Sequence, residues 1–349
     1  MSHCPLPDFE GCIHHIDDES TGVRGVIAIH STALGPAAGG CRLWHYESDD
    51  DMVADAMRLA RGMSYKNALA GLPFGGGKSV LQRPKGDFDR KTLFRVFGEA
   101  VEALGGRYVT AEDVGTTVED MMVVRKQTSY VAGLETAPGM AGGDPSPWTA
   151  LGVFLSMREA ARMALGSDVE GLTVAVQGVG NVGTGLCRLL SEAGAKLIIA
   201  DVNRARVDAL AKELGATVMG ADEIISAQAD IFAPCALGAV INARSILQLK
   251  ARLVCGGANN QLETDQDGFA LQKRGITYAP DYLVNAGGII NVAAEYLHET
   301  TEDVHERVTR IPERVREVLL LASQIGQPTH RVADTMAERI ISGVRVKAA

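Results

Sequence analysis

The stretch LTVAVQGVGNVGTGLCRLLSEAG, residues 172–194, decides the fold of the second half of the chain. It opens with an apolar, β-branched run, continues through the glycine-rich segment GVGNVG at 178–183, and ends in a segment with helical character. This order of strand, glycine-rich turn and helix is typical of a Rossmann dinucleotide-binding unit. The sequence therefore predicts that a dinucleotide binds here.

Each position of this loop has a physical role. Gly178 permits the tight turn, Gly180 lets a pyrophosphate approach the backbone, and Gly183 permits close packing of the helix. Asn181 and Val182 complete the loop, at a helix N-terminus that favours phosphate. Three turn glycines without a ligand would have the same spacing, but the flanking strand and helix favour the dinucleotide site.

Asp201 ends the next predicted strand, KLIIAD, and suits a carboxylate that accepts hydrogen bonds from the adenosine ribose. A carboxylate there also repels a 2′-phosphate, which favours NAD over NADP. Arg204 leaves the NADP alternative open, because its cation could bind that phosphate.

Further short apolar runs alternate with helical segments on either side of this stretch, which predicts an α/β fold with two domains. The turn-rich segment APGMAGGDPSP at 137–147 separates them. We expect an N-terminal α/β domain at 1–145 and a Rossmann-type NAD-binding domain at 146–325. A C-terminal helix within 326–349 could pack back on the first domain.

The pattern predicts particular elements in both domains. In the first, CIHHID and VRGVIAIHS form a strand pair. The other predicted strands are SVLQ, RYVTAED, ATVM, DIFAPC, RLVCGG and ITYAP, and the predicted helices cover 50–69, 89–104, 117–128, 148–165, 303–323 and 328–345.

Bulk composition excludes several functional classes. The chain has 349 residues and a net charge of −9, and such an acidic balance argues against a nucleic acid or an anionic membrane as partner. The sequence has neither a secretory signal nor an apolar run of the roughly 20 residues that span a bilayer, so we expect a cytoplasmic protein. The six cysteines form no CxxC pair, and no metal site is expected.

Lys66 and Lys78 stand out because both are bracketed by apolar and glycine residues. A partly buried ammonium group is costly unless it has a partner or a function. GGGKS suggests a phosphate-binding P-loop, but that motif requires glycine at position 72, which is Leu72, and a strand before the loop where a helix is predicted.

Several motifs in one order resemble the leucine, phenylalanine and valine dehydrogenases of the glutamate dehydrogenase superfamily. The resemblance covers nearly the whole chain. It rests on HSTALGPAAGG, the Lys66 and PFGGGK pair, TAEDVGT, QGVGNVG, FAPCALG, GGANNQL and YAPDYLVNAGG.

The resemblance implies a role for each site residue. Lys66 would bind the substrate carboxylate with Asn260, and Lys78 would be the general base that activates water, its ammonium form disfavoured by burial and by nearby Lys66. Asp113, otherwise a common turn carboxylate, would exchange protons with the substrate amine. The Gly39 and Gly40 backbone would approach that amine, and Asn285 would bind the cofactor.

The resemblance also places four apolar residues around the substrate side chain: Ala38, Ala111, Ile289 and Val292. Glutamate dehydrogenases carry a serine where Val292 stands, so glutamate is expected to be a poor substrate. The motifs disagree on the preferred hydrophobic amino acid: TAEDVGT resembles leucine enzymes, whereas GPAAGG and the ANN of GGANNQ resemble phenylalanine enzymes. The resemblance further implies that the domain at 1–145 is the substrate, catalytic and oligomerisation domain, with an active-site cleft between it and the NAD-binding domain. Relatives are homo-oligomers, and we expect the same here.

The expected activity is reversible, NAD-dependent oxidative deamination of a hydrophobic L-amino acid to its 2-oxo acid and ammonia. One alternative is a catalytically silent NAD-binding sensor, which the presence of both lysines, Asp113 and Asn260 disfavours. Another is a Rossmann dehydrogenase of different chemistry, which would need a histidine paired with an acid. The eight histidines form no such motif.

Overall fold

The computed structural model describes residues 9–134 and 137–343, and their contacts divide into two compact units. Unit 1 comprises the chain up to Gly143, Val292–Thr301 and the described residues from Ala337; unit 2 comprises Asp144–Asn291 and Glu302–Met336. The predicted boundary after residue 145 lies beside this division. Residues 292–301, which the sequence assigned to the second domain, group with unit 1. The local pattern does not reveal this change, because helix α10 (Gly287–Tyr296) continues through Val292.

Unit 1 contains a mixed six-stranded sheet in the order β1-β2-β5-β3-β6, with β4 also paired to β5. The predicted strand pair is confirmed, since β1 and β2 are antiparallel. The strands are β1 (Cys12–Asp18), β2 (Val23–Ser31), β3 (Ala37–Ala38), β4 (Cys41–Trp44), β5 (Gly75–Gln82) and β6 (Tyr108–Val109). The predicted strand over 107–113 is thus shorter than expected, because beyond Val109 the segment pairs only through isolated bridges at Thr110 and Glu112.

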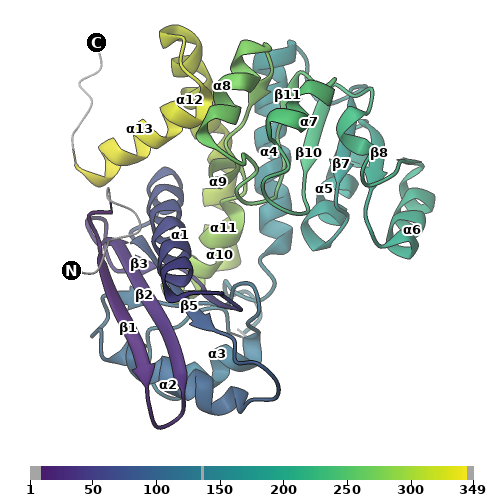
Figure 1. Cartoon of the computed structure of the whole chain (residues 1–349). Coiled ribbons are helices and arrows are strands. Elements are labelled where there is room, and N and C mark those ends of the chain that lie inside the picture. The colour runs from purple at the N-terminus through teal and green to yellow at the C-terminus, as the bar shows by residue number, and fades with distance from the viewer. Residues whose placement is uncertain (1–8, 135–136, 344–349) are drawn as a thin grey trace. The chain divides into compact units, whose positions relative to one another are not determined.

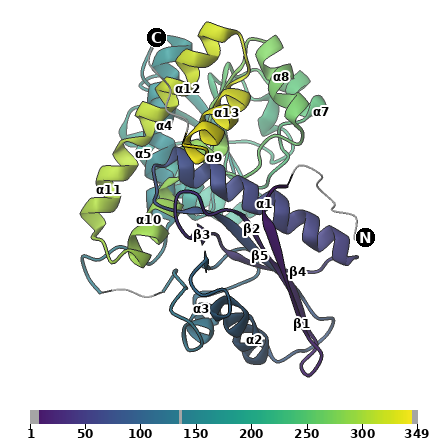
Figure 2. The same cartoon turned by 90° about the vertical axis from the view of Figure 1, so that its left-hand side faces the viewer.

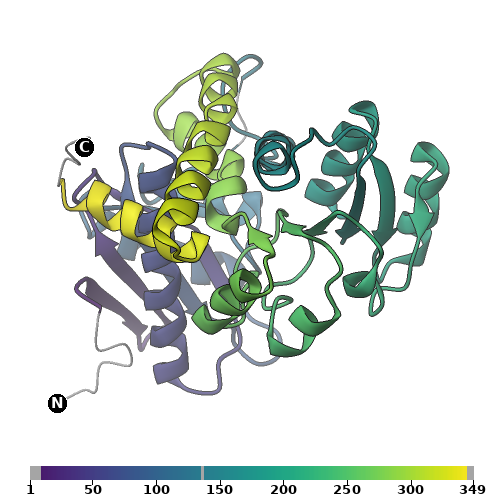
Figure 3. The same ribbon diagram turned by 90° about the horizontal axis from the view of Figure 1, so that it is seen from above.

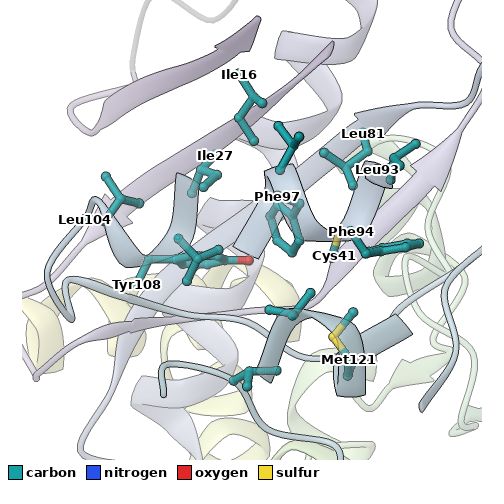
Figure 4. Close-up of a cluster of buried hydrophobic side chains, with 14 of the residues drawn as sticks. Ile16, Ile27, Cys41, Leu81, Leu93, Phe94, Phe97, Leu104, Tyr108 and Met121 are labelled. Carbon is teal, nitrogen blue, oxygen red and sulfur yellow. The ribbon is translucent and has the colours of Figure 1, made fainter. Parts of the chain in front are cut away.

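Helices cover both faces of this sheet (Figure 2). Helix α1 (Asp49–Leu69) packs on one face, where Met57 and Ala60 share a buried hydrophobic cluster with Val26 and Val80. Helices α2 (Arg90–Glu102) and α3 (Val118–Arg125) pack on the other face and enclose the aromatic core drawn in Figure 4. The sheet that carries the candidate residues is therefore held rigidly between two layers.

Local capping explains where α1 begins. The Ser48 side chain accepts a hydrogen bond from the backbone N–H of Asp51, and acidic residues occupy the first turn. Both features stabilise a helix N-terminus. The helix prediction over 50–69 is confirmed to within one residue at its start.

Unit 2 contains a parallel sheet in the order β12-β11-β10-β7-β8-β9, the arrangement of a Rossmann fold (Figure 1). Strand order reverses between β7 and β10, where such folds bind their ligands. Helices α7 and α8 pack on one face and α4 and α5 on the other. The elements are α4 (Ser146–Leu165), β7 (Thr173–Gln177), α5 (Asn181–Glu192), β8 (Lys196–Ala200), α6 (Arg204–Leu214), β9 (Thr217–Val218), η1 (Ile224–Ser226), β10 (Ile231–Pro234), α7 (Ala243–Gln248), β11 (Leu253–Val254), α8 (Asp265–Lys273), β12 (Thr277–Tyr278) and α9 (Asp281–Val284).

The C-terminal part differs from the prediction of two long helices. The single helix expected over 303–323 is two, α11 (Thr301–Thr309) and α12 (Ile311–Ile325), followed by α13 (Thr329–Ile341). Pro312 lies in the first turn of α12, a position that needs no N–H donor, and it starts a new helix there. These helices are yellow-green to yellow in Figure 3. In the described part of the chain, none of the helices is long and apolar enough to cross a membrane.

Candidate active site

Lys78 lies in the middle of β5, opposite Ala28 of β2, and only 5% of it is exposed. Its Nζ atom lies 2.8 Å from Oδ2 of Asp113. The sequence predicted a buried lysine but considered only burial and Lys66 as influences on its charge. The structure adds a carboxylate at hydrogen-bond distance from this amine.

The glycines before Lys78 belong to this strand, not to a phosphate-binding loop. A Cβ atom on Gly76 would lie 2.0 Å from the backbone nitrogen of Ser64 in α1, and one on Gly77 would lie 2.8 Å from the Tyr108 ring. Glycine therefore lets α1 and β6 approach β5 closely. That close approach holds the Lys78 backbone firmly within the unit.

Asp113 follows β6 in a segment that runs beside β4. The Cys41 N–H donates to the carbonyl of Ala111 at 2.8 Å, and the Leu43 N–H donates to the carbonyl of Val114 at 3.0 Å. The backbone N–H of Asp113 donates to the Thr116 hydroxyl at 2.8 Å. These bonds fix the turn that carries the carboxylate.

The charge of Asp113 is set by two cations. Burial acts to raise the pKa of Asp113, but the attraction and hydrogen bonds of Lys78 and Arg42 outweigh it and hold the pKa below its usual value. The Arg42 Nε atom lies 3.2 Å from the same Oδ2 atom that contacts Lys78. Asp113 is thus an ionised carboxylate at neutral pH.

Sequence reasoning missed the network of residues that links Arg42 to Asp55. The Arg42 Nη1 atom lies 3.0 Å from Oδ2 of Asp55, and the Tyr46 hydroxyl donates to the same oxygen at 2.6 Å. Arg58 Nη2 lies 2.7 Å from Oδ1 of Asp55. No local pattern identifies this network, because β4, α1 and the Asp113 segment are far apart in the sequence.

Gly39 and Gly40 lie against this group. A Cβ atom on Gly39 would lie 1.8 Å from the carbonyl oxygen of Gly77, and one on Gly40 would lie 2.9 Å from Cβ of Asp113. The packing of the unit itself therefore requires both glycines. Ala38 is partly buried in β3 and Ala111 is buried, so both proposed pocket residues of this segment are small.

Lys66 lies in the last turn of α1 and is partly buried. The helix packs against β5, so Lys66 and Lys78 come from adjacent elements. A cation near a helix C-terminus also has a purely structural benefit, because it interacts favourably with the helix dipole. Its role toward a substrate remains a prediction.

In unit 2 the glycine-rich loop has the geometry that dinucleotide binding requires. Gly178 has a φ of 94°, in the region that favours glycine, and a Cβ atom on Gly183 would lie 2.0 Å from the Gly178 carbonyl oxygen. A Cβ atom on Gly180 would meet only the Arg206 Nη1 atom, at 4.0 Å. Gly180 is the N-cap of α5, which begins at Asn181 and continues through Val182. The second glycine is therefore open, whereas the third is closely packed.

Asp201 braces this loop from the end of β8. Its Oδ2 atom accepts a hydrogen bond from the Val179 N–H, and its Oδ1 atom accepts one from the Asn203 N–H, both at 2.8 Å. Arg204, considered as a possible phosphate ligand, pairs with Asp208 one turn further along α6 at 3.0 Å. Arg206 is the basic side chain near Gly180, and the sequence pattern did not single it out.

Asn285 lies at the end of α9, and one of its buried polar atoms has no hydrogen-bond partner among the described residues. Its Nδ2 atom donates to the Asn259 side chain at 2.8 Å, but its Oδ1 atom has no hydrogen-bond partner among the described residues. Such a buried oxygen has the capacity to accept a hydrogen bond from a ligand. Asn260 is exposed and has a φ of 51°.

The predicted pocket residues Ile289 and Val292 are three residues apart on α10 and therefore lie on one face of that helix.

Comparison with known proteins gives matches over almost the whole chain. Residues 9–130 match the Glu/Leu/Phe/Val dehydrogenase dimerisation domain, and residues 144–203 and 197–341 match the Glutamate/Leucine/Phenylalanine/Valine dehydrogenase family model.

Individual relatives agree with these matches. A leucine dehydrogenase of Bacillus subtilis (strain 168) is 48% identical, with 94% of this chain and 90% of the relative covered. A phenylalanine dehydrogenase of Bacillus thermotolerans is 41% identical, with 93% and 86% covered. The crystal structure of L-tryptophan dehydrogenase from Nostoc punctiforme matches with a TM-score of 0.85 at 38% identity, covering 95% of this chain and 96% of that one.

Proposed function

The chain belongs to the Glu/Leu/Phe/Val dehydrogenase family and is an amino-acid dehydrogenase, and we propose that it oxidises a hydrophobic L-amino acid with NAD and water. The products are the 2-oxo acid, ammonia, NADH and a proton, and the reaction is reversible. The single observation that carries this proposal is the pair of buried Lys78 and partly buried Asp113, with 2.8 Å between ammonium and carboxylate. A silent NAD-binding sensor would have no use for such a pair.

The residues of unit 2 fit NAD. The open Gly180, the N-terminus of α5 and the orphaned Oδ1 atom of Asn285 offer donors and acceptors for the pyrophosphate and the nicotinamide end. Asp201 would accept hydrogen bonds from the adenosine ribose. When bound, NAD supplies the acceptor for the hydride that leaves the substrate Cα.

The preference for NAD over NADP rests on Asp201, which would repel a 2′-phosphate. The pairing of Arg204 with Asp208 supports this preference, since that cation is already engaged. Arg206, near Gly180, is the remaining cation that could favour a phosphate.

The chain's own residues would bind and deprotonate the substrate. Lys66 and the Asn260 side chain would hold the substrate carboxylate, since a cation and a neutral donor together suit a planar anion. Asp113 would accept a proton from the substrate amine, which must become neutral before hydride leaves Cα. Lys78 in its neutral form would then take a proton from the water that attacks the resulting imine.

Hydride transfer and hydrolysis make opposite demands on water. Water must be excluded while hydride moves and admitted once for hydrolysis.

The substrate class follows from apolar pocket residues. Ala38, Ala111, Ile289 and Val292 would surround the side chain without any charge. A distal carboxylate would be buried there unpaired, which is unfavourable. An apolar pocket discriminates a methylene by only about 1–3 kcal/mol, so leucine, valine, isoleucine, methionine and phenylalanine are all expected substrates.

The test is to mix the protein with NAD or NADP and each of a panel of L-amino acids and to follow NADH or NADPH absorbance. We expect turnover of the hydrophobic amino acids with NAD, slower turnover with NADP, and poor turnover of glutamate and aspartate. No reduction with any amino acid would favour the sensor, and efficient glutamate turnover would show that the pocket residues are assigned wrongly.

We also propose that the chain forms a homo-oligomer, which is supported by the match of residues 9–130 to a dimerisation domain. Light scattering should give a mass that is a multiple of the 36.9 kDa chain. A monomeric mass would refute this proposal.

A further inference from the structure

The two cations around Asp113 both contact the same oxygen. Lys78 Nζ lies 2.8 Å and Arg42 Nε lies 3.2 Å from Oδ2. The closest contact of each cation is therefore with Oδ2. The Asp113 side chain is 25% exposed, so a ligand can reach the carboxylate.

Arg42 is held in this position by a second carboxylate, that of Asp55. Its Nη1 atom lies 3.0 Å from Asp55, whose carboxylate is also bound by the Tyr46 hydroxyl and by Arg58. The side chains of Arg42 and Asp55 are 20% and 16% exposed, so solvent screens this pair only partly. Charges alternate along the row from Lys78 through Asp113, Arg42 and Asp55 to Arg58.

Only an arginine can make this link. Its planar fork presents Nε and Nη1 to two carboxylates in fixed directions, and it keeps its proton at all accessible pH values. A lysine has one compact charge and cannot span both carboxylates in this geometry. This matters because Lys78 must lose its proton to act as a base, and Asp113 then loses one of its two cations.

We propose that Arg42 is a positioning residue for the reaction, which keeps Asp113 oriented with Oδ1 toward the substrate amine and supplies a permanent positive charge that lets Lys78 become neutral. This inference rests on the proposed function. Arg42 touches neither substrate nor cofactor in this account and acts only through Asp113 and Lys78.

The other titratable groups around β5 do not take over this charge. Asp113 is its carboxylate partner, and Lys66 is a further cation from α1. Burial raises the pKa of the Cys41 thiol to about 12 and also raises the pKa of the Tyr108 phenol, so both stay neutral near pH 7. His30 on β2 has a pKa lowered by burial and is neutral there as well. The permanent cation next to Asp113 is Arg42.

The experiment compares Arg42→Met and Arg42→Lys with wild type in kcat and in the pH profile of kcat/KM. In Arg42→Met we expect kcat to fall about 10- to 100-fold, since a small misplacement of a reacting group has effects of this size. The acid limb of the kcat/KM profile, where activity rises with pH, should move to higher pH by about one unit. The reason is that the Asp113 carboxylate would then pair with Lys78 alone, which favours the protonated form of the lysine. Arg42→Lys should restore the limb but not the full kcat.

Arg95→Met is the matched control, since among the described residues Arg95 pairs only with Glu99, on the exposed surface of α2. It should retain wild-type kcat and pH profile. If Arg42→Met proves unstable by thermal unfolding, Asp55→Asn removes the anchor behind Arg42 instead, and a smaller loss of kcat with the same direction of pH shift is expected.

An Arg42→Met enzyme with kcat within twofold of wild type and an unmoved acid limb would overturn this inference and leave the proposed function intact. A loss of kcat without any shift of the limb, equal in Arg42→Met and Arg42→Lys, would assign Arg42 a structural role only. A wild-type enzyme without amino-acid dehydrogenase activity would instead refute the proposed function.

Discussion

The candidate residues of unit 1 and the glycine-rich loop of unit 2 are built on opposite principles. In unit 1 the chemistry depends on charged side chains, Lys78, Asp113 and Arg42, that come from three separate segments and meet through the sheet. In unit 2 it depends on backbone shape, with the turn at Gly178 and the close contact of Gly183 set within a few consecutive residues. Substitutions in the two regions should therefore impair the protein in different ways.

Loss of a charged side chain at the unit 1 site should leave the fold stable but reduce catalytic activity. A methyl group added to the glycine-rich loop of unit 2 should instead weaken NAD binding or lower the stability of the fold. Activity, NAD affinity and thermal unfolding, measured together on each variant, separate these outcomes.

Lys78→Ala should have the largest effect, because it removes the proposed base without touching unit 2. We expect turnover to fall by about 10²- to 10⁴-fold, the range that general base catalysis contributes. NAD affinity, measured by titration of protein fluorescence, should stay nearly unchanged. Substantial remaining deaminase activity would show that the mechanism is wrong.

Lys66→Ala should mainly raise the KM for the amino acid through loss of the carboxylate partner. The expected size is about 2–5 kcal/mol if the site is desolvated, with a smaller effect on kcat. Steady-state kinetics over a range of amino-acid concentrations checks this. An unchanged KM would leave Lys66 with only its structural position at the end of α1.

Gly183→Ala and Gly180→Ala form a pair that tests the backbone site. Gly183→Ala should destabilise the protein by about 1–3 kcal/mol, since its Cβ would overlap the Gly178 carbonyl oxygen. Gly180→Ala should change the free energy of unfolding by less than about 1 kcal/mol and yet weaken NAD binding at least about tenfold, because the methyl group faces the pyrophosphate. Equal NAD affinity in Gly180→Ala and wild type would argue against a dinucleotide at this loop.

Ala38→Leu should have the smallest effect, a change of preference among substrates. A larger side chain in the proposed pocket should reduce kcat/KM for phenylalanine more than for valine, by about 1–3 kcal/mol at most. Parallel kinetics with the two amino acids measure this ratio. A variant that came to favour phenylalanine would place the pocket elsewhere.

The same contrast explains what could be predicted from the sequence. The strand, loop and helix around GVGNVG are local, and their spacing alone indicated the turn at Gly178 and the contact of Gly183. The resemblance gave Lys78 and Asp113 as site residues, but not their ion pair. Arg42, Asp55 and Tyr46 were missed because their contacts depend on how β4, α1 and the segment after β6 pack. The break before Pro312 was missed because the apolar period continues across it.

The central claim is that hydride leaves the substrate Cα for the nicotinamide. L-Leucine carrying deuterium at Cα should be incubated with the enzyme and NAD, and the NADH examined by mass spectrometry, with 2-oxo acid and ammonia quantified in parallel. The account predicts one deuterium in the nicotinamide ring and equal amounts of NADH, 2-oxo acid and ammonia. Deuterium lost to water, or NADH formed without ammonia, would contradict it.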